Sequence, residues 1–270
     1  LVFNFLILKP IDQMKRTVFF FIIFCSCACL WSAERSIPKR VLFVGNSYTH
    51  YENMPQTVAS FATNRGLSLE TRKSTPGGAT LEQHWIGKKG NATINTRGQI
   101  ENGEFDAIVL QEQSLRPIHN PEKMLEYAVK LDESVKQKGG LVFLYMTWSR
   151  EATPETQDKL KASYEAVAKQ TGATVAPVGL AWELARERMP GISLYASDGS
   201  HPSRLGSYLA ACVIFSTLTG ESCKGLPPRA MSTDQAGESI LLMRISKTDA
   251  TFIQSIADET MRMYQQPNAN

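Results

Sequence analysis

The sequence has few cysteines and no cluster of metal-ligating residues. Three of its five cysteines, Cys25, Cys27 and Cys29, fall in one N-terminal apolar segment. No Cys-x-x-Cys pair or Cys/His group stands elsewhere, so the sequence offers no metal site of the zinc type. For Cys212 and Cys223, which remain, the spacing leaves a disulfide and two separate thiols equally open.

The chain also lacks clusters of basic charge, internal repeats and interior linkers. Its 29 Lys and Arg and 26 Asp and Glu are dispersed, with a net charge of +3, so nothing favours a nucleic-acid partner. A composition of 43% hydrophobic and 20% charged residues is ordinary for a globular protein with ample core material. We therefore predict one folded domain over residues 34–270.

Long hydrophobic runs are absent except near the N-terminus. Val18–Leu30 follows Lys15 and Arg16, a pattern typical of a secretory signal and too short for a comfortable membrane span. We predict that residues 1–33 hold an upstream extension and a signal peptide, and that the mature chain is exported to the periplasm or the exterior without a membrane partner. The alternatives are a retained anchor or lipid attachment at a cysteine of this segment.

Short apolar runs alternate with segments of helical periodicity along the rest of the chain. Strands are expected at Val41–Val44, Leu67–Thr71, Phe105–Leu110, Leu141–Met146 and Thr174–Val178. Helices are expected at Met54–Gly66, Glu122–Lys138, Thr153–Gln170, Leu180–Arg188 and Leu205–Leu218. Gln235–Tyr264 is expected to be helical in one or two pieces, with any break near 246–249. This order predicts an α/β fold, a flavodoxin-like three-layer α/β/α sandwich with about five parallel strands.

The first strand ends abruptly at Gly45, Asn46 and Ser47. Open α/β sheets bind their ligands outside the carboxyl ends of the strands, and Gly45 supplies the backbone freedom that a sharp exit requires. Ser47 is therefore a candidate nucleophile, followed by a polar and aromatic loop over Tyr48–Asn53.

A general base for Ser47 is offered much later, by Asp198-Gly-Ser-His201. An Asp three residues before a His, on a loop broken by Gly and Pro, can fold back onto the imidazole and fix its tautomer. Alone this spacing is weak, because a capped turn before the following helix explains it equally well. Its combination with a strand-terminal serine predicts a Ser47, His201 and Asp198 triad.

At this point the chain resembles the SGNH/GDSL hydrolases, which are esterases and acyl hydrolases of flavodoxin-like fold. The resemblance covers Arg40–Thr219. Gly45-Asn46-Ser47 resembles the first block of the family, and Asp198 with His201 resembles the last block. Gly77-Gly78 is similar to the second block, and the resemblance implies that a glycine N–H of this pair joins the Ser47 N–H in an oxyanion hole. We choose Gly78, although the sequence leaves Gly77 open.

The third block departs from the family pattern, because Gln111-Glu112-Gln113 stands where Gly-x-Asn-Asp is usual. We expect Gln111 to donate to the oxyanion, with Gln113 as the alternative donor. Asn46, Gln113 and Trp148 are expected to bind substrate, with Trp148 as a cleft wall or, alternatively, part of the core.

Other polar residues receive no catalytic role. His84 is interpreted as a loop residue without a partner, and Glu112 as a structural hydrogen-bond acceptor.

Together these features predict an exported serine esterase that hydrolyses acyl esters, with acetyl groups on carbohydrate as the expected substrate. Neither a metal nor an organic cofactor is needed for this chemistry. A lipase or thioesterase with a longer acyl preference is one alternative. A non-catalytic carbohydrate-binding protein of the same fold is another, favoured by the altered third block.

Overall fold

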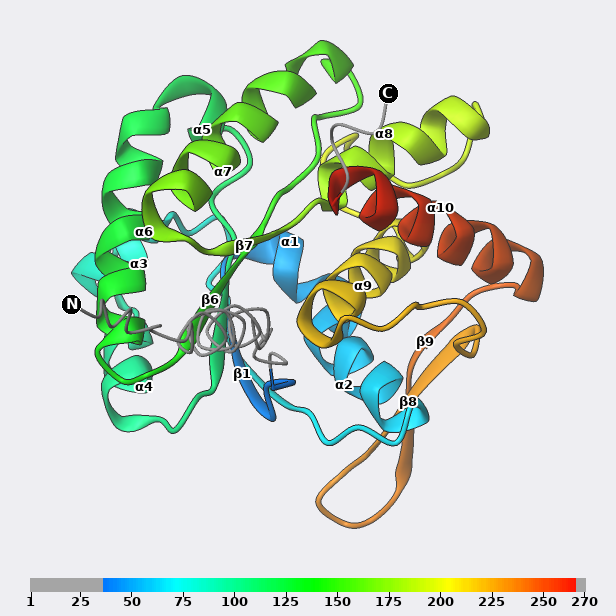
Figure 1. The fold of residues 1–270 in the computed structure, drawn as a ribbon, viewed down its shortest axis with the longest axis horizontal. Coiled ribbons are helices and arrows are strands. Elements are labelled where there is room, and N and C mark those ends of the chain that lie inside the picture. Colours follow the sequence, from blue (N-terminus) through cyan, green and yellow to red (C-terminus); the bar gives the residue numbers. More distant parts are fainter. Residues whose placement is uncertain (1–35, 266–270) are drawn as a thin grey trace, which may run out of the picture. The chain divides into compact units, whose positions relative to one another are not determined.

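A five-stranded parallel sheet organises the fold (Figure 1). The computed structural model describes residues 36–265, so the predicted signal peptide lies outside the described residues. The strands are β1 (Arg40–Val44), β2 (Glu70–Ser74), β5 (Ala107–Leu110), β6 (Leu141–Tyr145) and β7 (Thr174–Ala176), in the order β2-β1-β5-β6-β7. The order reverses direction between β1 and β5, and such a switch point is where doubly wound sheets bind ligands.

Strands β1, β5, β6 and β7 are largely buried, as their continuous apolar runs predict, whereas the edge strand β2 is polar and partly exposed. In β1, Val41 and Phe43 point into one hydrophobic cluster and Leu42 and Val44 into the other, and all four are fully buried. This alternation follows from the two-residue period of a strand. It makes the sheet the middle layer of the predicted three-layer sandwich.

Helices cover each face of the sheet. One face carries α2 (Met54–Asn64), α8 (Val178–Arg188), α9 (Arg204–Thr219) and α10 (Lys247–Gln265), and the other carries α3 (Leu81–Ile86), α4 (Thr96–Asn102), α6 (Pro121–Lys136) and α7 (Gln157–Thr171). Smaller elements include α1 (Ser47–His50), α5 (Arg116–His119), 3-10 turns at Tyr51–Asn53 and Pro154–Thr156, and the hairpin β3 (Lys88–Lys89) with β4 (Ala92–Thr93). The α/β sandwich fold predicted from the sequence is thus confirmed.

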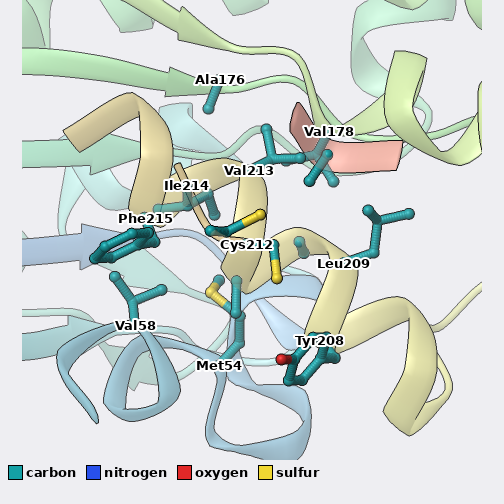
Figure 2. Packing of buried hydrophobic residues seen from close by; sticks show 14 of the residues in the cluster. Met54, Val58, Ala176, Val178, Tyr208, Leu209, Cys212, Val213, Ile214 and Phe215 are labelled. Carbon is teal, nitrogen blue, oxygen red and sulfur yellow. The ribbon is translucent and has the colours of Figure 1, made fainter. Parts of the chain in front are cut away.

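Helix α9 is buried on nearly every side, because it packs between α2, α8 and α10. Figure 2 shows Phe215 of α9 beside Val58 of α2, and Val213 of α9 beside Val178 of α8. Cys212 and Cys223 are both free, buried thiols in the structure. Of the two arrangements left open by their spacing, the structure therefore has the free thiols, and the two side chains interact with each other.

The second strand begins three residues later than predicted. Gly66 adopts a left-handed conformation after α2, and Leu67 N–H donates to Ala62 O at 2.9 Å. These contacts hold Leu67 in the helix C-terminal turn, so β2 can start only at Glu70, which pairs with Arg40 of β1.

The predicted helix over Gln235–Tyr264 is wrong in its first part. A hairpin of β8 (Arg229–Thr233) and β9 (Ser239–Arg244) occupies that region. The turn is closed by Asp234 Oδ1, which accepts from Ala236 N and Glu238 N, and by Gly237 at φ +85°. Only the second part of the prediction is helical: α10 begins at Lys247, within the range 246–249 where a break between two helical pieces was expected.

Within residues 36–265, no helix combines the length and the apolar character needed to cross a lipid bilayer.

Candidate active site

The exit from β1 is a tight turn that leads directly into α1, where a loop is predicted. Asn46 caps this short helix, because its Oδ1 accepts from Tyr48 N at 3.1 Å. A side chain at position 45 would collide with Gln111 Oε1 and Thr49 Oγ1, so glycine is required there. The turn places Ser47, half-buried, beyond the carboxyl end of β1.

The loop that carries His201 is shaped by the Asp198 carboxylate. Asp198 Oδ1 accepts from Ser200 N at 3.0 Å and from His201 N at 2.9 Å, while Oδ2 lies 2.5 Å from His201 Nδ1. The hydrogen bond from the His201 ring is the largest cause that lowers the pKa of Asp198, to about 2. Asp198 is therefore a carboxylate at neutral pH and accepts a hydrogen bond from the N–H at His201 Nδ1.

His201 and Ser47 meet across the edge of the sheet. His201 Nε2 lies 2.8 Å from Ser47 Oγ. A neutral imidazole whose Nδ1 carries the proton has a bare Nε2, so His201 Nε2 accepts from the Ser47 hydroxyl. The structure thus brings the three residues predicted as a triad into one hydrogen-bonded chain.

Aromatic side chains hold the His201 loop in place. Tyr48 Oη lies 2.6 Å from Ser200 Oγ, and Trp148 Nε1 donates to Ser200 O at 3.0 Å. The ring of Tyr51 stacks on His201 with 4.7 Å between centroids. The imidazole is therefore fixed from both its backbone and its ring face.

The Gly77-Gly78 loop lies beside the nucleophile turn. Ala79 N donates to Pro76 O at 3.1 Å, and Gly78 takes φ +62°, as at the third position of a type II turn. Asn46 Nδ2 donates to Ala79 O at 3.0 Å, which ties this loop to the nucleophile turn. Among residues 36–265, the backbone N–H groups of Ser47, Gly77 and Gly78 have no hydrogen-bond partner.

Gln111, the expected oxyanion donor, is fully buried beneath the nucleophile turn. Its Oε1 accepts from Asn46 N and Thr49 Oγ1, both at 2.9 Å, and its Nε2 donates to Glu112 O. Through these contacts Gln111 supports the nucleophile turn from below. The geometry therefore does not support the expectation that Gln111 donates to the oxyanion.

The alternative donor, Gln113, is also used locally. Its Oε1 accepts from Leu115 N and Arg116 N, and its Nε2 donates to Ser114 Oγ at 3.3 Å. Gln113 therefore caps the turn that precedes α5 and is not among the residues gathered around Ser47.

Two residues expected to bind substrate are buried. Asn46 is 2% exposed and Trp148 is 1% exposed. The Trp148 ring stacks between Tyr48 and Trp182, with centroid distances of 4.6 and 3.8 Å. Of the two alternatives for Trp148, the structure favours the core, because a ring covered on both faces cannot form the wall of an open cleft.

His84 lies in α3 and is fully buried, contrary to its interpretation as a loop residue without a partner. Its Nε2 lies 2.8 Å from Gly45 O and its Nδ1 lies 2.6 Å from Thr96 Oγ1. Burial lowers the pKa of His84 to about 4. The sequence did hold a signal for this helix, because Thr80 and Gln83 form a capping box.

In the part of the chain from 36 to 265, no group of three His, Cys, Asp or Glu side chains is placed to hold a metal ion.

Solved structures similar to this one include hydrolases and esterases. A candidate SGNH hydrolase from Slackia heliotrinireducens is 29% identical, with 66% of this chain and 98% of that chain covered and a TM-score of 0.58. A DUF4886 family protein from Bacteroides uniformis is 20% identical, with coverages of 83% and 94% and a TM-score of 0.63. An acetylxylan esterase from Geobacillus stearothermophilus is 14% identical, with coverages of 67% and 94% and a TM-score of 0.52.

No protein-family model and no curated protein matches the sequence. The likeness to the esterase, at its low identity, shows a shared fold. The resemblance to the SGNH/GDSL hydrolases is nevertheless confirmed, since the structural neighbours of this chain are SGNH/GDSL hydrolases and esterases.

Proposed function

We propose that this chain is an exported serine ester hydrolase that removes acetyl or other short acyl groups from carbohydrate. The observation that carries the proposal is the hydrogen-bonded chain from Ser47 Oγ through His201 to Asp198. A serine next to an imidazole that is oriented by a carboxylate is the arrangement that activates a hydroxyl for acyl transfer. The SGNH fold shared with known esterases supports the same reaction class.

In the first half of the reaction, His201 Nε2 takes the Ser47 proton as Ser47 Oγ attacks the ester carbonyl carbon. The unpaired N–H groups of Ser47 and Gly78 are suited to stabilise the tetrahedral oxyanion. When the intermediate collapses, the carbon–oxygen bond to the alcohol breaks and His201 returns the proton to the leaving alkoxide. Asp198 stays ionised and stabilises the imidazolium.

In the second half, a water molecule attacks the acyl-Ser47 ester while His201 takes one of its protons. When the second intermediate collapses, the bond between the acyl carbon and Ser47 Oγ breaks and His201 returns its proton to Oγ. This step releases the carboxylic acid and regenerates the Ser47 hydroxyl. Every proton in this cycle moves between Ser47, His201, water and the substrate, so the two half-reactions balance without a redox or metal partner.

The choice of acetyl groups on carbohydrate is supported by two observations. An acetylxylan esterase shares this fold, and the pattern of residues 1–33 predicts export to a compartment where polysaccharides are met. A longer acyl group remains the competing substrate.

Hydrolysis of p-nitrophenyl acetate by wild type and by Ser47→Ala tests the reaction class. We expect turnover by wild type and none above background by Ser47→Ala; equal rates would exclude the proposal. A fluorophosphonate probe should label Ser47 in wild type and fail to label His201→Ala, whereas a non-catalytic binding protein would show no such labelling.

A series of acyl lengths from acetate to octanoate, followed by acetate release from acetylated xylan, tests the substrate class. A rate that rises with chain length would favour the lipase or thioesterase alternative. Export is tested separately, by fractionating cells that express the full chain and sequencing the N-terminus of the mature protein.

A further inference from the structure

The peptide group between Gly45 and Asn46 is held at both of its polar atoms by buried side chains. His84 Nε2 lies 2.8 Å from Gly45 O, and Asn46 N donates to Gln111 Oε1 at 2.9 Å. Both side chains are fully buried. This peptide immediately precedes the Asn46–Ser47 peptide, which carries the Ser47 N–H, so holding its plane helps to fix the direction in which the chain leaves the strand towards Ser47.

The hydrogen-bond directions around His84 follow from the partner at each nitrogen. A backbone carbonyl can only accept, so His84 Nε2 carries the proton and donates to Gly45 O. The neutral ring then has a bare Nδ1, which accepts from the Thr96 hydroxyl at 2.6 Å. Thr96 Oγ1 in turn accepts from Ser74 Oγ at 2.7 Å.

These contacts close on themselves. Gly45 N donates to the backbone carbonyl of Ser74 at 3.0 Å, and the Ser74 hydroxyl begins the chain that returns to Gly45 O through Thr96 and His84. The closed circuit joins the ends of β1 and β2 to α3 and α4. Hydrogen bonds in such buried chains polarise one another, and each depends on the others being made.

We infer that His84 is a positioning residue for the Ser47 nucleophile, acting through the carbonyl oxygen of Gly45. The inference rests on the proposed function, because it assigns His84 to that reaction. His84 touches neither His201 nor Asp198 by any hydrogen bond within residues 36–265. Its effect is therefore to hold the turn, and a displacement of a reacting group by about 1 Å can cost about 10²-fold in rate.

The central experiment compares His84→Leu with His84→Gln in ester hydrolysis. Leucine removes the donor to Gly45 O, so we expect kcat to fall by about 10- to 10²-fold, with KM little changed because the circuit does not contact substrate. Glutamine places an amide N–H where Nε2 stands, so it should recover most of the lost kcat. A His84→Leu variant with wild-type kcat, or a His84→Gln variant as slow as His84→Leu, would overturn the inference.

Thr96→Val provides a second route if His84→Leu fails to fold. The valine removes the donor to Nδ1, which frees the ring to adopt the tautomer that cannot donate to Gly45 O. Thr171→Val is the matched control, because Thr171 is a buried threonine of α7 whose hydroxyl donates to Val167 O, away from the nucleophile. We expect kcat to fall for Thr96→Val and to stay at the wild-type value for Thr171→Val; equal losses would indicate a general stability effect and overturn the inference.

Hydrogen–deuterium exchange decides the positioning claim without any turnover. The amides of Gly45 and Asn46 should be protected in wild type and exchange faster in His84→Leu. Unchanged exchange would overturn the inference even in an active enzyme. If wild type showed no Ser47-dependent hydrolysis, but exchange was still faster in His84→Leu than in wild type, the proposed function would be excluded. The conclusion that His84 holds the turn would then still stand.

Discussion

His201 Nε2 lies 2.8 Å from Ser47 Oγ, although the two residues are 154 positions apart in the sequence. Two local features bring them together. The Gly45 turn presents Ser47 at the carboxyl edge of the sheet, and the Asp198 carboxylate folds the loop before α9 back over the same edge. The triad geometry is therefore a property of the sheet topology and of two short, self-capped loops.

Replacing Asp198 by asparagine separates its two functions. The carbonyl oxygen of the introduced amide can still accept from Ser200 N and His201 N, so the loop should keep its shape. The amide nitrogen cannot accept from His201 Nδ1, so the ring is driven to the tautomer that carries a proton at Nε2. We expect Asp198→Asn to lower kcat, approaching about 10⁴-fold, with an unchanged temperature of unfolding. Steady-state kinetics and thermal unfolding of the variant measure both effects.

Asp198→Ala is the companion variant, because it removes the loop contacts as well as the contact to His201. It should lose activity and also show faster amide exchange at Ser200 and His201. If Asp198→Asn retained wild-type kcat, the carboxylate would not orient the base.

The Tyr48 hydroxyl is predicted to matter for turnover through Ser200. It lies 2.6 Å from Ser200 Oγ, next to the residue that carries the imidazole. Tyr48→Phe removes one hydrogen bond worth about 1 kcal/mol, so we expect kcat to fall by about fivefold as the His201 loop loosens. The matched control is Tyr208→Phe, which removes a buried hydroxyl that donates to Pro227 O. The control should lower the unfolding temperature and leave kcat unchanged; the reverse pattern would contradict the assignment.

The buried strands and their parallel sheet could be predicted from the sequence because each buried strand is a short continuous apolar run. Arg40–Val44 and Ala107–Leu110 have buried side chains on both faces, so their sequences carry no helical period that could mislead. The type of β9 could not be predicted in this way. Ser239–Arg244 is a short apolar run, and such a run is compatible with either a helix or a strand. Only the Asp234 and Gly237 turn, which pairs it with β8, decides between them.

In the site, the residues of the Ser-His-Asp chain could be predicted from the sequence. The positions of the buried residues that support the nucleophile turn could not. Ser47, Asp198 and His201 are marked by local motifs. The hydrogen-bond partner of a buried amide or imidazole depends on contacts between segments that are distant in the sequence. Gln111 accepts from Asn46 N, and His84 donates to Gly45 O. Spacing along one chain does not encode such contacts, so the sequence alone predicts Gln111 at the oxyanion and His84 without a partner.

Alanine at position 78 should damage the site and alanine at position 77 should not. Gly78 adopts φ +62°, a conformation that costs an L-residue about 1 to 2 kcal/mol, whereas Gly77 has neither a positive φ nor any atom close to where an alanine methyl group would lie. We expect Gly78→Ala to shift the loop and lower kcat by about 10²-fold, the cost of one oxyanion donor. Gly77→Ala should turn over like wild type. Equal kinetics in the two variants would remove Gly78 from the oxyanion hole.

Glu112 is predicted to make the protein less stable as the pH rises towards neutrality. Its side chain is fully buried, Oε1 accepts from Leu81 N and Gln113 N, and Oε2 has no partner among residues 36–265. Burial raises the pKa of Glu112 from 4.5 to about 7, against the opposing effect of the two N–H donors. Between these values the native state binds more protons than the unfolded state, so the free energy of unfolding falls as the pH rises through this window and stays lowered above it.

The side chain at position 112 carries no charge at any pH in Glu112→Gln. The free energy of unfolding of this variant, relative to that of wild type, should therefore increase by up to about 3 kcal/mol as the pH is raised from acid to slightly alkaline. Urea unfolding of both proteins across this range measures the difference, in which the titration of all other groups cancels. Parallel curves for the two proteins would show that Glu112 ionises in the folded state as it does in water.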